Sequence, residues 1–176
     1  MIFLLVLAFG SSPARAAEAG CEIREWSNRR GEATYYRVSS EGRVVFWRRQ
    51  PEVSKHSNEG SQEGIRTWES SEAYRACARR GFELPAFEDF EALRSCFERE
   101  ASDSRVLSER GLREFHELFP SMTRDWYWSV SVYPGNPSYA FLFSGKMGMM
   151  DGLPGRYPGR VVCVVRPKTN DQGSSP

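Results

Sequence analysis

The chain contains four cysteines, and their number and setting limit how it can fold. Cys21, Cys77, Cys96 and Cys163 lie far apart in the sequence, and no two of them form a C-x-x-C pair. The missing pair argues against a redox motif and against a zinc ribbon. An even number of cysteines in an exported chain predicts two disulfide bonds, because the compartments outside the cytoplasm are oxidising. Their positions alone leave all three pairings open.

The prediction of export comes from the start of the chain. An apolar run from Ile2 to Phe9 is followed by Ala14-Arg15-Ala16. The run is too short to span a bilayer, and the A-x-A pattern is typical of a signal-peptide cleavage site. We therefore expect residues 1–16 to be removed, although no Lys or Arg precedes the run. The alternatives are a buried N-terminal helix and lipidation of Cys21 as the first mature residue.

The mature chain predicted in this way carries no net charge. Cleavage removes Arg15, one of 24 basic residues, and leaves 23 against 23 acidic ones. A neutral chain has no overall field to attract nucleic acid or an anionic membrane. The length suits one domain, residues 17–167, before a tail at 168–176 that we expect to be disordered. No later stretch is apolar enough to cross a membrane, so we expect a secreted or periplasmic protein.

The order of the expected secondary-structure elements predicts an α+β fold. Strands come first, then two or three helices, then strands again. The expected strands are 34–38, 44–47, 126–132, 139–143 and an apolar central strand at 161–165; the expected helices are 67–80, a segment after Leu84-Pro85, and 104–119. Thr67 is the expected cap of the first helix and Gly81 its stop. Residues 51–64 and 151–155 are expected to be loops, the first of them functional or disordered.

Five short motifs in a fixed order resemble a family of bacterial exported domains. The family is named for the C-terminal domain of the collagen-like adhesin Lcl and belongs to the C-type-lectin-like superfold, which also includes formylglycine-generating enzymes. The resemblance covers about residues 42–166. Its motifs are the early strand GRVVFW, the segment GIRTW with AYRAC, the helix start ELPAFEDFEAL, the strand YWSVS and the closing VVCVVR. The chain departs from the family where Ala86 replaces Thr, Glu83 replaces Arg, and Val162 replaces Arg.

The resemblance implies a C-type-lectin-like domain, with two or three helices packed on small antiparallel sheets. It also implies that Cys77 pairs with Cys163 and Cys21 with Cys96. Calcium-dependent sugar binding would need a cluster of loop oxygens beside a cis-proline. The usual Glu-Pro-Asn, Gln-Pro-Asp and Trp-Asn-Asp signatures are missing, and the nearest substitutes, Asn136-Pro137 with Asp125 and Asp151, are read as solvated turn residues.

No catalytic group of residues is recognisable, so we expect no enzyme, cofactor or metal. G-x-S-x-G, H-E-x-x-H and a phosphate-binding glycine loop are all missing. The two histidines, His56 and His116, are expected at the surface. The acidic residues at 88, 89 and 91 are read as partners of a helix dipole. Formylglycine-generating chemistry would need two reactive cysteines close together, and only Cys163 lies in the C-terminal part.

The candidate ligand contacts are aromatic and arginine residues between Trp126 and Arg160. In a strand, Trp128 shares the parity of Val130 and is expected in the core, so Tyr127 would face outward. Exposed aromatic side chains near turns can stack on sugars or fill partner pockets. The candidates are Tyr127, Tyr139, Arg156, Tyr157 and Arg160, with Tyr133 near the same turns and Lys146 and Arg124 completing a basic rim.

These observations predict a binding module that recognises a glycan or protein ligand outside the cytoplasm without calcium, as in surface adhesion. The first alternative is a structural or assembly component of a cell-envelope complex. The second is an enzyme of the formylglycine-generating type.

Overall fold

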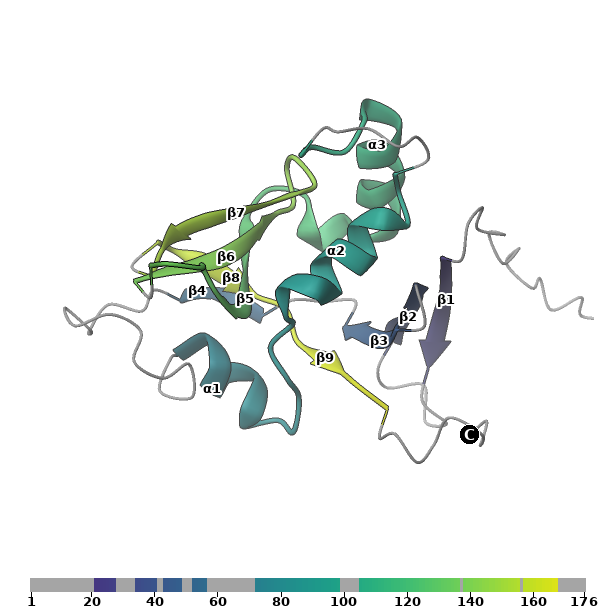
Figure 1. Ribbon diagram of the computed structural model, residues 1–176. Helices are drawn as coiled ribbons and strands as arrows, with labels where there is room; N and C mark the ends of the chain where they lie inside the picture. Colours follow the sequence, from purple (N-terminus) through teal and green to yellow (C-terminus); the bar gives the residue numbers. More distant parts are fainter. Residues whose placement is uncertain are drawn as a thin grey trace, which may run out of the picture.

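The computed structural model describes residues 21–27, 34–40, 43–48, 52–56, 72–98, 105–136, 138–155 and 157–167 (Figure 1). These residues form two sheets, three α-helices and a short 3-10 helix, η3 (Pro120–Met122). The predicted α+β class is therefore confirmed. The expected signal peptide, the helix cap at Thr67 and the C-terminal tail lie outside the described residues. Within them, no helix combines the length and the hydropathy needed to cross a membrane.

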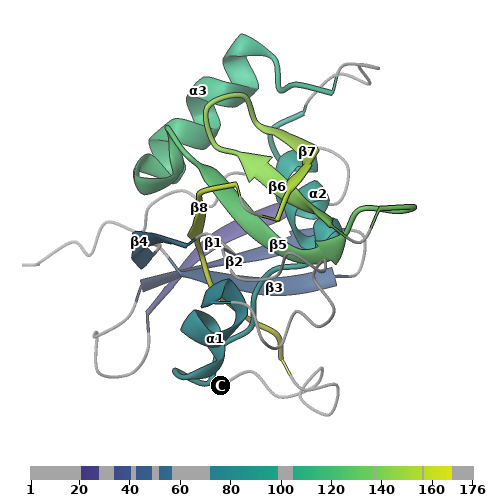
Figure 2. The same cartoon turned by 90° about the vertical axis from the view of Figure 1, so that its left-hand side faces the viewer.

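The first sheet contains the N-terminal strands. Its antiparallel order is β1 (Glu22–Ser27), β2 (Thr34–Ser40), β3 (Arg43–Arg48) and β9 (Val164–Val165). Figure 2 shows β1, β2 and β3 side by side. Alternate side chains are buried in β2 and β3, as expected for a sheet with one covered face. The two strands predicted from this part of the sequence are confirmed.

The second sheet has the order β4 (Glu52–His56), β8 (Gly159–Val161), β5 (Trp126–Val132), β6 (Tyr139–Ser144) and β7 (Met149–Pro154). All its pairs are antiparallel except β5 with β8. The prediction of loops at 51–64 and 151–155 is wrong for the residues of β4 and β7. Both are edge strands, which tolerate polar residues, Gly and Pro because one side of the strand has no partner strand.

The apolar run at 161–165 is not one central strand, as the sequence predicted. Val161 ends β8 in one sheet and Val164 begins β9 in the other, while Val162 and Cys163 lie between the two strands. Residues 161–164 are all buried. The run is apolar on every side because the chain passes from sheet to sheet through the core.

The three predicted helices are present. They are α1 (Glu72–Ala78), α2 (Phe87–Ser95) and α3 (Glu109–Leu118). Gly81 follows α1 with φ of 72°, the left-handed conformation that commonly ends a helix. Gly111, which weakens α3 intrinsically, is required because an added Cβ would lie 2.4 Å from the Phe97 carbonyl oxygen.

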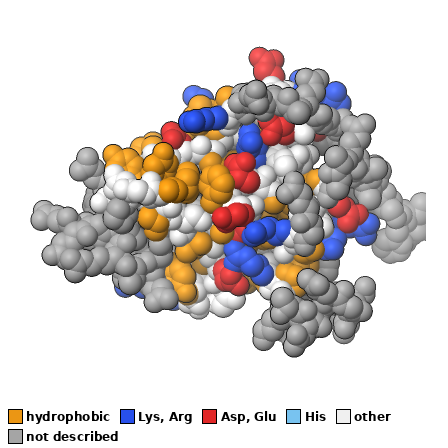
Figure 3. Space-filling model, in the orientation of Figure 1, with side chains coloured by type: hydrophobic (Ala, Val, Ile, Leu, Met, Phe, Trp, Pro, Cys, Tyr) orange, Lys and Arg blue, Asp and Glu red, His pale blue; other side chains and the backbone are white. Residues whose placement is uncertain are grey.

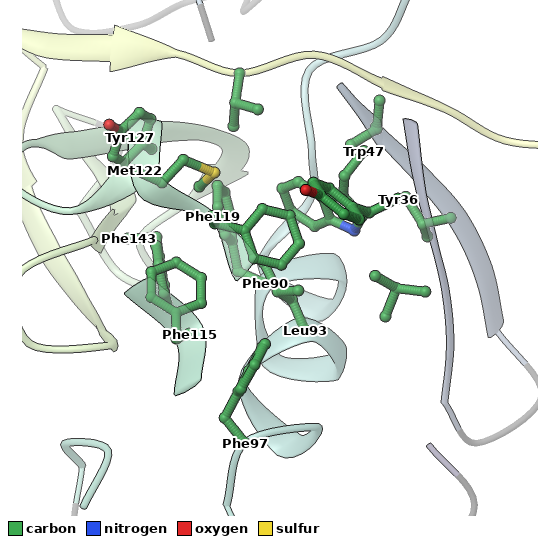
Figure 4. Close-up of a cluster of buried hydrophobic side chains, with 14 of the residues drawn as sticks. Tyr36, Trp47, Phe90, Leu93, Phe97, Phe115, Phe119, Met122, Tyr127 and Phe143 are labelled. Atoms are coloured by element: carbon green, nitrogen blue, oxygen red, sulfur yellow. The ribbon is translucent and has the colours of Figure 1, made fainter. Parts of the chain in front are cut away.

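The helices cover both faces of the second sheet. Ala73 and Cys77 of α1 pack with Trp128 and Leu142 on one face. On the other, α2 and α3 share an aromatic core with the first sheet, and α2 lies between the two sheets (Figure 1). Figure 4 shows the side chains of this core pointing toward one another. Phe90 is its centre, with its ring centroid 5.0 Å from Trp47 and 4.9 Å from Phe143.

A fully buried carboxylate joins α2 to the ends of the domain. Asp89 forms ion pairs with Arg43, at 3.0 Å, and with Arg166. Its Oδ2 also accepts the backbone N–H of Ala86 at 2.7 Å. The reading of this residue as a simple helix-dipole partner was therefore incomplete. Asp89 fixes the start of the helix where Ala86 offers no capping hydroxyl, and it connects β3 to the segment after β9.

Both disulfide pairings implied by the resemblance are present. Cys77 of α1 is bonded to Cys163, with 5.6 Å between their Cα atoms, and Cys21 to Cys96 at the end of α2, with 5.4 Å. No cysteine of the chain is free. The sulfur of Cys21 is therefore not available for a thioether-linked lipid, which argues against the lipidation alternative.

Candidate functional site

Tyr127 does not face solvent, and this prediction is wrong. Its side chain is fully buried, and its hydroxyl donates a hydrogen bond to the Ser121 carbonyl oxygen at 2.9 Å. In the β5–β6 register Tyr127 lies opposite Phe143, while Trp128 lies opposite Leu142. The two neighbours do point to opposite faces, but helices cover both faces, so both are core residues.

Arg160 is committed to a contact inside the domain. It forms an ion pair with Asp125, and it lies opposite Tyr127 in the parallel pairing of β8 with β5. The pKa of Tyr127 is raised to about 12, chiefly by burial and next by the Asp125 carboxylate, while Arg160 opposes the shift. Arg160 is thus held in an ion pair where β8 meets β5, and it is not a free cation on a basic rim.

The raised pKa of Tyr127 predicts a loss of stability at high pH. Below pH 10 the phenol is protonated in both states and its full contribution is present. Between pH 10 and about 12 the unfolded chain loses this proton and the native state keeps it, so unfolding becomes easier by roughly 2–3 kcal/mol. Urea denaturation at pH 9 and 11.5 measures the loss. The Tyr127→Phe variant should lose less than the wild type over this interval, and an equal loss in both would contradict the assignment.

The remaining predicted residues do not form one site. Tyr157 is half-buried on the α1 side of the sheet, where its ring lies 6.2 Å from that of Trp126. Tyr139 lies on the opposite side, in register with Pro154 and near the ring of Tyr133. Arg156 lies outside the described residues. The structure therefore separates Tyr139 from both Tyr157 and Arg160.

Tyr139 instead belongs to an aromatic face, which we define as Phe87, Tyr133, Tyr139 and Phe141. The ring of Tyr133 lies 6.5 Å from that of Tyr139 and 5.2 Å from that of Phe141, and Phe141 lies 4.5 Å from Phe87. Tyr133 is 42% exposed, the most of any large apolar side chain in the part of the chain that the structure describes. The aromatic face is thus an accessible surface made of four touching rings.

The aromatic face continues the core beyond the first residue of α2. Along β6, Phe143 packs under Phe90 and Phe141 under Phe87, the first residue of the helix. The next residue of the same parity, Tyr139, has no helical residue of α2 above it. The rings at this end of the sheet are partly exposed because α2 begins at Phe87, above Phe141, and does not reach Tyr139.

Backbone contacts hold the aromatic face in place. The N–H of Tyr133 donates to the Tyr139 carbonyl at 2.9 Å, and the N–H of Tyr139 donates to Asn136 at 3.0 Å. Gly152 of β7 lies directly beneath Tyr133, because a Cβ added there would be 2.2 Å from the tyrosine Cδ2. The ring thus rests on backbone and needs little further ordering to bind a ligand.

One acidic residue, Glu88, follows Phe87 of the aromatic face and is exposed. Asp151 is exposed as well and accepts the Gly152 N–H at 2.8 Å, but it pairs with Leu142 and therefore lies on the α1 side of the sheet. Figure 3 shows hydrophobic side chains gathered over the β5–β7 strands, with acidic and basic groups at their edge. Lys146 lies beyond Ser144, the last residue of β6, which is itself about 17 Å from Tyr139 along the strand. Glu88 is thus an exposed acidic residue directly beside a ring of the aromatic face in the sequence.

The oxygen atoms considered for calcium are not gathered. Asp125 is paired with Arg160, Asp151 binds the Gly152 backbone, and Asn136 Oδ1 accepts the Ser138 N–H at 3.1 Å. No group of three or more His, Cys, Asp or Glu residues close enough to hold a metal ion occurs in the described ranges. His116 is half-buried, and its Nε2 lies 2.7 Å from the Gly145 carbonyl oxygen, so it is less exposed than expected.

No protein-family model matches the chain, and no curated protein matches it. The resemblance to the Lcl C-terminal family therefore continues to rest on the sequence motifs.

Proposed function

We propose that this protein is an exported binding module of the C-type-lectin-like class that holds a glycan on its aromatic face without calcium. The observation that carries the proposal is the aromatic face itself. Tyr133 is well exposed, touches two further rings and rests on Gly152. Rigid exposed aromatic side chains are typical of recognition surfaces, since they offer contact area at a low cost in conformational entropy.

The disulfides support the assignment to the C-type-lectin-like class. The bond from Cys77 of the first helix to Cys163 near the end of the domain is the pairing that the sequence resemblance implies. The order of the elements is also the expected one, with N-terminal strands, helices and C-terminal strands. β9 returns to pair with β3, which brings the two ends of the family-like region together.

Export is supported by the same bonds. Paired cysteines persist in oxidising compartments and are rare in the cytoplasm. The signal peptide predicted at residues 1–16 independently supports a location in the periplasm or outside the cell.

A glycan-array screen of the oxidised protein, with calcium and with a chelator, tests the proposed function. We expect selective binding that is equal in both conditions. The double variant Tyr133→Ala/Tyr139→Ala should lose most of this binding, because it removes both tyrosines of the aromatic face.

The matched control is Glu117→Ala, an exposed position on α3 outside the aromatic face. This variant should bind like the wild type. Binding that disappears in chelator would contradict the proposal. If no glycan on the array is bound and a protein partner co-purifies from envelope extract, the alternative of an assembly component is favoured.

An enzyme of the formylglycine-generating type is the less favoured alternative. Its chemistry needs reactive thiols, whereas Cys163 is almost fully buried and bonded to Cys77. Thiol nucleophiles must be accessible and ionised to react.

A further inference from the structure

We infer that the aromatic face selects neutral glycans, by stacking one pyranose ring on the free side of Tyr133. This inference rests on the proposed function and names its ligand class. It differs from the basic rim expected from the sequence, which would have selected sulfated or carboxylated sugars.

The geometry of Tyr133 leaves one side of its ring for a ligand. The residue is 42% exposed; Gly152 lies against the Cγ–Cε2 edge of its ring, and the rings of Tyr139 and Phe141 are tilted against it by 57° and 47°. The hydrogen atoms on one face of a pyranose form an apolar patch of about the area of a phenol ring, and such a patch can pack on an aromatic face. Because the ring is already held by its neighbours, little side-chain entropy is lost on binding.

The charges near the ring favour a neutral ligand. Glu88, next to Phe87, is an exposed carboxylate that can accept hydrogen bonds from sugar hydroxyls. The same carboxylate repels sulfate and carboxylate groups. Of the basic residues that the structure describes in the expected rim, Arg160 is paired with Asp125 and Lys146 lies past the far end of β6.

The experiment is isothermal titration calorimetry at low salt with four probes. Cellohexaose and chitohexaose are neutral, while a heparin hexasaccharide and hexagalacturonic acid are anionic. We expect saturable binding of at least one neutral probe and no binding of either anionic one.

Three variants locate the contact. Tyr133→Phe keeps the ring and should bind within about threefold of the wild type, whereas Tyr133→Ala should bind about tenfold more weakly. Gly152→Ala leaves every aromatic residue in the sequence but pushes the Tyr133 ring from its place, so it should also lose about tenfold. Near-ultraviolet circular dichroism checks the fold of each variant.

A fourth variant tests the charge argument by gain of binding. Glu88→Lys changes an exposed border residue and should make heparin binding measurable. The inference is overturned if wild-type protein binds heparin in preference to neutral probes, or if Tyr133→Ala and Gly152→Ala bind neutral probes normally. Preference for heparin would leave glycan binding itself intact, whereas failure of all glycans would overturn the proposed function as well.

Discussion

Replacing Cys77 and Cys163 together with alanine is expected to lower the free energy of unfolding by about 4–5 kcal/mol. The bond closes a loop with a sequence separation of 86 residues, and the chain-entropy model gives this value for a loop of that length. Both side chains are buried where α1 meets the second sheet, so the cross-link also fixes the helix against the sheet. Urea denaturation of the oxidised proteins, followed by circular dichroism, measures the difference.

The double variant avoids leaving one free thiol that could form a wrong disulfide. The variant Cys21→Ala/Cys96→Ala is the matched comparison, since its loop has a separation of 75 residues and should cost nearly as much. A loss below about 1 kcal/mol for Cys77 and Cys163 would show that this bond does not constrain the domain. If the Cys77→Ala/Cys163→Ala variant kept its fold and stability and lost only a chemical activity, the alternative of an enzyme with a reactive Cys163 would be favoured.

Replacing Asp89 with alanine is expected to lower the free energy of unfolding by about 2–3 kcal/mol. The change leaves Arg43 and Arg166 without their shared buried carboxylate, and it removes the acceptor for the Ala86 N–H at the start of α2. Arg166 keeps its ion pair with Glu83 and Arg43 is 42% exposed, so the loss comes from the charge-assisted hydrogen bonds and from the start of the helix.

Glu88→Ala is the control for the Asp89 experiment. Glu88 stands next to Asp89 in the same helical turn but is exposed, so its loss should change stability by less than about 0.5 kcal/mol. Equal effects of the two substitutions would mean that Asp89 acts only through the helix dipole. In that case the ion pairs with Arg43 and Arg166 would not contribute to stability.

The fold class could be predicted because its evidence is local in the sequence. The alternation in β2 and β3, and the spacing of apolar residues in α2 and α3, mark each element within about ten residues. The secondary-structure predictions were wrong where contacts between distant parts of the chain determine whether a segment is a strand. β4 is polar, yet it pairs with β8 at the edge of a sheet, and the run at 161–165 is apolar because it crosses between sheets.

The error at Tyr127 has a similar cause. Period-two reasoning assumed that one face of β5 meets solvent, and it assigned that face to Tyr127. The alternation itself holds, but α1 covers one side of the second sheet and α2 and α3 cover the other. The residue was misplaced because the helix positions are not contained in the pattern of a single strand.

The aromatic face could be predicted only in part. Tyr133 and Tyr139 stand beside a turn signal of Pro and Gly, which marks them as surface candidates. What makes Tyr133 a platform is Gly152, which is distant in sequence and reaches it through the pairing of β6 with β7. Likewise, Arg160 looked free because its partner, Asp125, is distant in sequence and lies just before β5.

The most direct test of the central claim is a nuclear magnetic resonance titration of the oxidised protein with its best-bound glycan, in the presence of a chelator. The measurement follows the ring signals of Tyr133 and Tyr139 and their contacts with sugar protons. The account predicts saturable shifts of both rings and contacts from the sugar to Tyr133. Saturable binding that leaves both rings unchanged and shifts residues elsewhere would contradict it.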